Sequence, residues 1–325
     1  GKFVDEVFWR LYFKAWLERR PQVWRHYRAE VRHGLDRIAT EAGLRARWEA
    51  ACRGETGIEG FDDWARALVR DGWLHNHERM WFASIWIFTL ELPWALGADF
   101  FLRHLLDGDP ASNTLSWRWV AGLHTTGKTY LADPEVIAAC TDGRFRPTGL
   151  ATRAEAPKPD IDATPTDSPR DEETDAAARI GLLLTEDDLS PGWVVDGLAP
   201  VGVAVLDGTA ERSPLEVAPS VRRFADGLVE DAVGRLGLGP VRRIGSDGDL
   251  AEWVAEFGIG QVVCARPPVG PAAERLERAT PPIGPQVRIA RLSRPADRLA
   301  RPHAGAGFFK FRKEIGGMLD ALGLP

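Results

Sequence analysis

Residues 105–119 read LLDGDPASNTLSWRW, and this stretch decides how the rest of the chain is interpreted. It holds two aspartates, Asp107 and Asp109, then an amide at Asn113, and then two tryptophans on either side of an arginine. A hydrophobic core does not need two carboxylates so close together, and a loop made for solvent does not carry two tryptophans. The stretch therefore predicts the wall of a binding site.

The composition limits the class of protein and the number of domains. With 325 residues the chain is long enough for two domains of ordinary size. A formal net charge of -6 argues against a protein that coats nucleic acid without sequence preference, so contact with phosphates would need a local basic patch. The apolar N-terminal run is interrupted by charge every few positions, so we expect neither a signal peptide nor a membrane span.

The cysteines indicate the redox environment. Cys52, Cys140 and Cys264 are odd in number and widely spaced, and they form no CxxC pair. This pattern predicts neither a disulfide framework nor a zinc or iron–sulfur site, so we expect no metal. It is typical of a protein of the reducing cytoplasm.

The chain changes character near residue 150. Eleven of the 13 tryptophans precede residue 120, and apolar residues there recur every three or four positions, as in ERMWFASIWIFTLEL at 78–92, which predicts helices. The run that starts at residue 151, ATRAEAPKPDIDATPTDSPRDEETDAAA, is acidic and proline-rich with little to bury, which predicts a disordered linker. Beyond it, β-rich runs such as IGLLLT and VGVAVLD alternate with amphipathic runs such as DLAEWVAEFG, which predicts a parallel sheet with flanking helices.

We therefore expect a mixed α and α/β protein of two domains. A helical domain would cover residues 1–150, a disordered acidic linker residues 151–177, and a Rossmann-like α/β domain residues 178–325.

Two further segments each place polar, charged and aromatic or thioether groups on one helix face. The side chains are spaced i, i+3 and i+4 in both segments: Asn76, Arg79 and Met80, with Trp73 one turn before them, and Glu6, Trp9 and Arg10. A tryptophan or methionine at helical spacing also suits an ordinary core, and an adjacent charge suits a solvated helix edge. The occurrence of both segments together with residues 105–119 favours the functional interpretation.

These segments resemble the flavin-binding helical domain of the DNA photolyases and cryptochromes. In that family a TG pair and a helix precede the motif GWMHNRxRM, and the motif DGDxAxNxxxWxW follows. In this chain the first pattern is similar to residues 55–80, ETGIEGFDDWARALVRDGWLHNHERM, and the second is similar to residues 105–122, LLDGDPASNTLSWRWVAG. The run DEVFWRLYF at 5–13 is similar to the family's NELxWRxFY helix. The matches follow the family's order over residues 3–123, and they imply an all-helical, photolyase-like domain that binds FAD.

The resemblance implies a role for each matching residue around the FAD. Asp107 would pair with Arg79, and the segment from Asp107 to Asp109 would line the ribityl and isoalloxazine part of the cofactor. Asn113 would lie against flavin N5, where an amide can donate a hydrogen bond without adding a second negative charge. The implied FAD-binding residues are Arg10, Trp73, His75, Asn76, Arg79, Asp107, Gly108, Asp109 and Asn113. The alternative role for Asp107 is a helix cap.

The resemblance also implies an electron path. In the family a chain of indoles carries an electron from the surface to the excited flavin, and Trp117 and Trp94 match its first two members. The outermost position falls on an alanine, so Trp48, one helical turn earlier, would substitute, or Trp81 or Trp86 would form a branch. These last three residues equally suit large core aromatics.

Several segments depart from the family pattern. The Ser/Thr-rich phosphate clamp that lies upstream of the WRxFY helix is absent, so either the chain lacks its natural start or the phosphates are held differently. Residues 122–145 do not resemble the family's loop at this place, which makes Lys128 and Tyr130 candidate contacts. The C-terminal half resembles the family's antenna-binding domain in permuted order. Its first turn, TEDDLSPGW at 185–193, lacks the expected arginines and asparagine, so we expect no antenna chromophore of the usual kind, and no GxGxxG follows a strand.

The function implied by the resemblance is FAD-dependent, blue-light-driven electron transfer that repairs cyclobutane pyrimidine dimers in damaged DNA, a carbon–carbon lyase reaction. Repair enzymes for (6-4) products carry histidines where Asn76 and Met80 stand. The implied reaction residues are Glu6, Asn113, Trp94, Trp117 and Trp48, and the implied lesion contacts are Glu6, Trp9, Asn76, Met80 and Trp119. The alternative is a cryptochrome-like sensor that photoreduces FAD and contacts a protein partner without repairing DNA. An electron-transfer flavoprotein in a biosynthetic role stays open.

Overall fold

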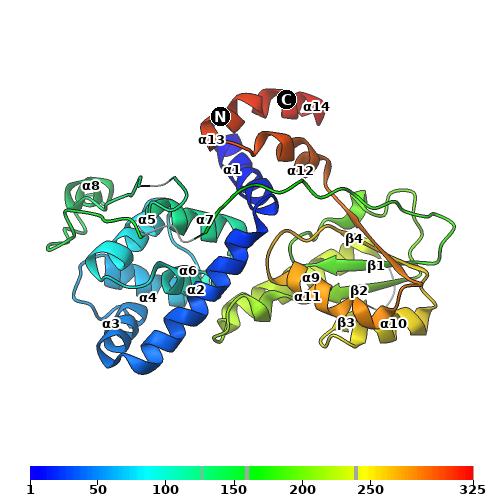
Figure 1. The fold of residues 1–325 in the computed structure, drawn as a ribbon, viewed down its shortest axis with the longest axis horizontal. Coiled ribbons are helices and arrows are strands. Elements are labelled where there is room, and N and C mark those ends of the chain that lie inside the picture. The colour runs from blue at the N-terminus through cyan, green and yellow to red at the C-terminus, as the bar shows by residue number, and fades with distance from the viewer. Residues whose placement is uncertain (126, 158–160, 238–240, 325) are drawn as a thin grey trace. The chain divides into compact units, whose positions relative to one another are not determined.

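The computed structural model describes residues 1–125, 127–157, 161–237 and 241–324 (Figure 1). The chain divides into two compact units, which we call the helical unit and the sheet unit. The helical unit comprises Gln22–Ala163 and Ser213–Val221, and the sheet unit comprises Gly1–Pro21, Thr164–Arg212 and Arg222–Pro325. The predicted fold class, a helical region followed by a parallel α/β sheet, is confirmed.

The helical unit is a succession of helices joined by short connections. They are α2 (Pro21–Thr40), α3 (Ala42–Arg53), α4 (Phe61–Asp71), α5 (Asn76–Ser84), the π-helical turn η1 (Ile85–Thr89), α6 (Trp94–His104), α7 (Pro110–Val120) and α8 (Pro134–Cys140). Local signals explain where they begin and end. Gly72 ends α4 with φ of 70°, in the left-handed region that favours glycine. Asp109 caps α7 and Pro110 occupies its first position, where a missing N–H costs nothing.

The core of the helical unit is dense in aromatic rings. Phe61 stacks on Phe82 with ring centroids 4.3 Å apart, and Phe82 in turn contacts Trp86 at 5.8 Å. Gly97 on α6 makes this packing possible, because a Cβ atom there would lie 2.3 Å from a ring carbon of Trp117. The glycine lets α6 and the indole of α7 approach more closely than any side chain would allow.

The sheet unit holds five parallel strands in the order β3-β2-β1-β4-β5. The strands are β1 (Ile180–Thr185), β2 (Gly202–Leu206), β3 (Val241–Ile244), β4 (Gln261–Ala265) and β5 (Arg288–Leu292). Leu183 points into one apolar cluster and its neighbours Leu182 and Leu184 into the other, so both faces of β1 are buried. Helices α10 (Asp249–Phe257) and α11 (Pro271–Ala279) cover one face, and α9 (Pro219–Leu236) contributes to the other.

Shorter elements complete the sheet unit. They are η2 (Pro191–Trp193), η3 (Thr209–Glu211), η4 (Pro281–Ile283), α12 (Pro295–Ala300), η5 (Arg301–His303), α13 (Phe308–Phe311), η6 (Arg312–Glu314) and α14 (Ile315–Ala321). Within the described residues, no helix combines the length and apolarity needed to cross a bilayer.

The first helix, α1 (Lys2–Glu18), belongs to the sheet unit, where it lies beside α12 and α13 (Figure 1). Glu18 forms an ion pair with Arg301 at 2.7 Å, and both side chains are less than a tenth exposed. The Tyr12 hydroxyl donates to the Ala306 carbonyl at 2.9 Å. The sequence predicts that residues 1–150 form one domain, whereas the structure groups α1 with the C-terminal helices. Periodicity finds the apolar face of α1 but cannot identify the distant residues that cover it.

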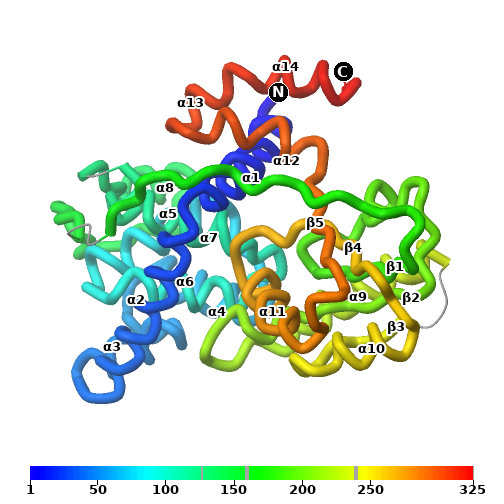
Figure 2. The backbone as a smooth tube through the Cα atoms, turned by 45° about the vertical axis from the view of Figure 1, so that its right-hand side comes forward, coloured from blue at the N-terminus to red at the C-terminus, as the bar shows by residue number. Residues whose placement is uncertain are grey.

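Part of the run over residues 151–177, where the sequence predicts a disordered linker, forms hydrogen bonds with other segments of the sheet unit. Residues 158–160 lie outside the described part of the chain. From Thr164 onward the run is extended, and Figure 2 shows it passing α1 and continuing to the strands. The Thr166 N–H donates to the Arg19 carbonyl at 2.7 Å, and the Glu172 carboxylate accepts the Arg291 N–H at 2.6 Å. The prediction of disorder was based on how little apolar surface the run can bury. In the structure, acidic side chains of the run bind the arginine-rich strand β5 instead.

Candidate functional site

Arg79 and Asp107 form the ion pair that the sequence predicts. Arg79 Nη2 donates to the two carboxylate oxygens of Asp107 at 3.2 and 3.0 Å, while Arg79 Nε donates to the Leu74 carbonyl at 2.9 Å. The Asp107 side chain is 54% exposed, so its oxygens remain open to a ligand. An exposed pair of this kind stabilises a fold by at most about 1 kcal/mol, so its main effect is to fix the position of both charges.

Asp109 and Asn113 lie deeper, on either side of the first turn of α7. The Asp109 carboxylate accepts the Ser112 N–H at 2.7 Å, so the helix cap that was the alternative role for Asp107 is made by Asp109. Asn113 Nδ2 donates to the Ala98 carbonyl on α6 at 2.8 Å. This bond uses one of the two hydrogens that an amide nitrogen carries. Gly108 is buried between the two aspartates.

The connection before α5 exposes three of the predicted residues. His75 caps α5 with Nδ1 accepting the His77 N–H at 3.3 Å, and the Glu78 carboxylate accepts the His75 N–H at 2.9 Å, which completes a capping box. Trp73 is 55% exposed, and Asn76 is exposed at the first position of α5. The sequence predicts Trp73 on the helix one turn before Asn76, but the chain turns at Gly72 and the helix begins only at Asn76.

Four of the predicted electron-path tryptophans, Trp81, Trp86, Trp94 and Trp117, are buried among other aromatic rings. Trp117 contacts Trp86 edge-on at 6.3 Å and Phe101 at 5.1 Å. Trp94, at the start of α6, contacts Tyr27 at 5.8 Å. Trp81 contacts Trp64 at 5.6 Å, whereas Trp48 is half-buried and has no ring contact among the described residues.

The predicted lesion contacts fall in both units. Trp119 in the helical unit is 39% exposed and stacks on Tyr130 at 5.5 Å. Met80 and Asn76 also belong to the helical unit, and Lys128 is exposed there. The three residues of α1 belong to the sheet unit: Glu6, Trp9 and Arg10. The ring of Trp9 stacks on Phe308 with centroids 3.5 Å apart and planes at 11°.

A buried group beside Trp94 was missed in the sequence. Tyr27 on α2 is fully buried, and burial raises the pKa of its phenol well above the ordinary value, with the charge of Asp99 adding to the rise. Burial also raises the pKa of Asp99, although Arg103 opposes the shift. Arg103 Nε lies 3.1 Å from Asp99 Oδ2. Trp24 and Tyr27 are spaced i, i+3, and this signal could have identified them.

The carboxyl ends of β1 and β2 are filled by their own side chains. Glu186 accepts the Gly208 N–H and the Thr209 hydroxyl, each at 3.1 Å, and burial raises the pKa of its carboxyl. Asp188 accepts two hydrogen bonds from Arg294, at 2.7 and 2.6 Å. In sheets of this order a ligand usually binds at the carboxyl ends of β1 and β4, where the strand order reverses. At the end of β1, Glu186 and Asp188 already accept hydrogen bonds from the chain.

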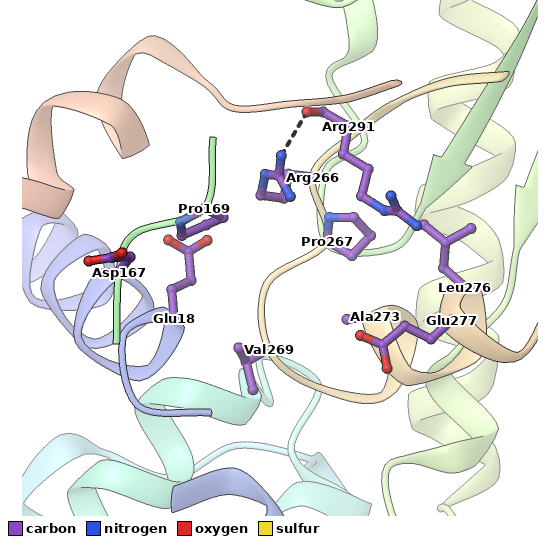
Figure 3. Close-up of a pocket in the computed structure, with 10 residues that line it drawn as sticks. All are labelled: Glu18, Asp167, Pro169, Arg266, Pro267, Val269, Ala273, Leu276, Glu277 and Arg291. Carbon is purple, nitrogen blue, oxygen red and sulfur yellow. Dashed lines mark hydrogen bonds between the residues drawn. The ribbon is translucent and has the colours of Figure 1, made fainter. Parts of the chain in front are cut away.

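A cavity of about 440 Å³ lies beyond β4 in the sheet unit (Figure 3). Arg266 and Pro267 face it from the end of β4, and Arg266 donates to the Arg291 carbonyl at 3.1 Å. Glu18 and Asp167 face it from the opposite side. Glu172 forms ion pairs with both arginines, so one of their two positive charges is offset within the chain.

Comparison with known proteins concerns the first part of the chain. Residues 3–149 match the family described as the FAD binding domain of DNA photolyase. The deoxyribodipyrimidine photo-lyase of Streptomyces griseus is 40% identical over 124 residues, which are 38% of this chain and 26% of that protein. The Vibrio cholerae protein of the same name is 27% identical over 164 residues, 48% of this chain and 32% of that protein. The Escherichia coli protein of the same name is 30% identical over 128 residues, which are 39% of this chain and 26% of that protein.

The chain thus spans about a quarter to a third of the length of these relatives. No solved structure matches it. The matched range contains the Arg79–Asp107 pair, Asn113 and the buried tryptophans, in the order that the sequence predicts. Residues 3–149 of this chain therefore belong to the family of photolyase FAD-binding domains.

Proposed function

We propose that this protein binds FAD and uses blue light to move single electrons, and that its reaction is the repair of cyclobutane pyrimidine dimers in DNA. The observation that carries the proposal is the Arg79–Asp107 ion pair, which lies with Asn113 in the matched range. Bound FAD would supply the light absorption and the one-electron chemistry.

The residues present fit such a cofactor. The open carboxylate of Asp107 suits hydroxyl groups of the ribityl chain, and Arg79 holds that carboxylate in place. Asn113 is anchored on Ala98 and keeps a second amide hydrogen for the flavin ring edge. The exposed Trp73 and Asn76 would complete the wall. Trp117 and Trp94 would return electrons to the site through the protein.

The residues proposed to contact the lesion include no histidine that could act as a proton donor. In the helical unit, Asn76 would hold the edge of a flipped base and Trp119 would stack on it, because every base has a face that an aromatic ring can cover. Glu6 and Trp9, which belong to the sheet unit, are lesion contacts by the resemblance alone. Met80 would fill the apolar space that remains. Free cysteines at positions 52, 140 and 264 suit the proposed cytoplasmic location.

A second candidate function is light sensing without repair. It is supported by the stacking of Trp9 on Phe308, which leaves one face of a proposed lesion contact covered by the chain itself. In that case photoreduction would change a contact with a protein partner.

Reconstitution with FAD, followed by a repair assay, tests the proposal. We expect wild-type protein to bind FAD non-covalently, and Asp107→Ala to bind it more weakly because a ribityl acceptor is lost. Reduced, FAD-loaded protein should convert a cyclobutane-dimer oligonucleotide in light but not in darkness. Glu6→Ala should weaken lesion binding and repair while the flavin spectrum stays the same. Protein that stays colourless with FAD contradicts the binding site; bound FAD with an intact oligonucleotide favours the sensor.

A further inference from the structure

The acidic run over residues 164–175, which we call the strap, covers the outer edge of β5, the last strand of the sheet. Two of its carboxylates accept main-chain N–H groups of this edge: Glu172 accepts the Arg291 N–H at 2.6 Å, and Asp171 accepts the Ser293 N–H at 3.0 Å. Within the described residues, a single main-chain bond joins the strap to β5, from the Glu172 N–H to the Arg291 carbonyl at 3.4 Å. The edge therefore binds the strap mainly through its carboxylates and not as a sixth strand.

Arginine side chains complete the anion sites at this edge. Four of them lie beside carboxylates of the strap: Arg266 and Arg291 beside Glu172, Arg298 beside Asp171, and Arg288 beside Asp175. The Glu172 carboxylate meets three donors, which are the Arg291 N–H and the guanidinium groups of Arg291 and Arg266 at 3.3 and 3.2 Å. Phosphate oxygens of nucleic acids are bound by the same two kinds of donor, arginine side chains and main-chain N–H groups.

We propose that the outer edge of β5 is a surface for the phosphate backbone of DNA, and that the strap closes this surface from within the chain. The choice of DNA as the partner rests on the proposed function. The net charge of -6 means that the chain as a whole does not attract nucleic acid, so phosphate contact needs a local group of arginines. Here four arginines face three carboxylates of the strap, which leaves one positive charge even when the strap is in place.

An acidic peptide is the alternative occupant, because a sheet edge can add a strand. Such a strand would bond to the edge through its own carbonyl groups. The outward N–H groups of Arg291 and Ser293 instead face carboxylates, and the remaining donors are guanidinium groups, which main-chain carbonyls leave uncompensated in charge. The edge thus selects oxyanions, and this pattern favours a phosphate backbone.

The strap is held by contacts that a polyanion can replace. The Glu172 side chain is 41% exposed, and ion pairs of exposed groups add little to stability and are screened by salt. Both ends of the strap are fixed by uncharged hydrogen bonds: the Thr166 N–H donates to the Arg19 carbonyl at 2.7 Å, and Gln261 Oε1 accepts the Asp175 N–H at 2.8 Å. The charged middle can therefore leave the arginines without release of the whole strap.

Affinity for undamaged duplex DNA in darkness tests this surface separately from repair. Asp171→Asn/Glu172→Gln, the strap variant, removes two charges that face β5 and keeps the shape of both side chains. The matched control, Glu173→Gln/Asp196→Asn, changes the net charge equally at two exposed carboxylates that form no ion pair in the described part of the chain. With a fluorescein-labelled duplex, fluorescence anisotropy should show tighter binding by the strap variant than by the control.

The salt dependence separates phosphate contacts from a general change in charge. Arg291 and Arg298 are the arginines that the strap variant frees, since Arg266 also donates to two main-chain carbonyls. Two added phosphate contacts should steepen the slope of log affinity against log salt concentration by about 1.8, so the advantage over the control should shrink about tenfold between about 50 and 200 mM salt. Arg298→Gln, added to the strap variant, should remove about half of the extra slope.

Hydrogen exchange locates the contact in the wild-type protein. When DNA replaces the strap, the Glu172 N–H loses its acceptor and should exchange faster, whereas phosphates should keep the N–H groups of Arg291 and Ser293 protected. DNA that binds at another surface leaves the exchange of all three N–H groups unchanged and overturns the assignment.

The outcomes for this surface and for the proposed function are distinct. Equal affinity and equal slope of the strap variant and the control overturn the surface, even where dimer repair is observed. A protein that repairs no dimers but shows the steeper slope keeps the surface and loses the proposed function. Tighter binding of a polyglutamate peptide without any gain for DNA, or dimers of the strap variant in light scattering, would assign the edge to a protein and overturn the nucleic-acid surface.

Discussion

Gly97 is the position where one methyl group should have the largest effect on the proposed electron path. A Cβ atom there would lie 2.3 and 2.5 Å from two ring carbons of Trp117 and 2.9 Å from Nε1 of Trp86. The Trp117 ring cannot yield easily, because Phe82, Phe101 and Trp86 surround it. Overpacking of a core in this way costs about 1–3 kcal/mol.

Helix propensity works in the opposite direction. Replacing glycine by alanine inside a helix gains about 1 kcal/mol, because less backbone entropy is lost on folding. The contact is so short that we expect a cost in the upper part of the overpacking range, so Gly97→Ala should lower the free energy of unfolding by about 1–2 kcal/mol. Gly43 on α3 is the matched control: its nearest neighbour is an arginine nitrogen at 4.0 Å, and Gly43→Ala should gain up to about 1 kcal/mol.

Urea unfolding followed by circular dichroism gives both free energies. In a Trp117→Phe background the smaller ring leaves room for the methyl group, so Gly97→Ala should cost less there than in the wild type. A Gly97→Ala protein that is as stable as the wild type, or more stable, would show that the ring of Trp117 does not lie against α6 and would refute the packing argument.

Three further predictions concern the reaction, the pH dependence and the sheet unit. Trp117→Phe should keep FAD bound but slow photoreduction, because it removes an oxidisable indole from the buried path; photoreduction at the wild-type rate would mean that Trp117 is not in the path. Burial lowers the pKa of His104 to about 4 from its usual 6.5; the unfolded chain therefore binds an extra proton between these values, and stability should fall by up to about 3 kcal/mol as the pH decreases from 6.5 to 4. His104→Gln should flatten this part of the pH profile measured by urea unfolding, and an unchanged profile contradicts the assignment. Because Glu186 and Asp188 are satisfied by Gly208, Thr209 and Arg294, purified protein should carry no second, near-ultraviolet chromophore in stoichiometric amount; absorption spectra of the denatured extract check this.

The sequence alone determined the features that depend on local pattern. The alternation of IGLLLT and VGVAVLD with amphipathic runs was enough for the parallel sheet, since strands buried on both faces read as continuous apolar runs. The pairing of Arg79 with Asp107 was implied by the resemblance of the ordered motifs to the photolyase family, and the structure contains this ion pair.

Only the tertiary structure decided which distant segments meet. The apolar face of α1 is recognisable in the sequence, but that Phe308 rather than a helix of the first half covers Trp9 depends on packing between segments at opposite ends of the chain. The same holds for Tyr27, whose contact with Trp94 joins α2 to α6, and for the acidic run at 164–175, whose partners are arginines of β5. The physical reason is that burial and ion pairing do not depend on how far apart two residues are in the sequence. The sequence shows which side chains need to be buried or paired with an opposite charge, but only the tertiary structure shows which residues they contact.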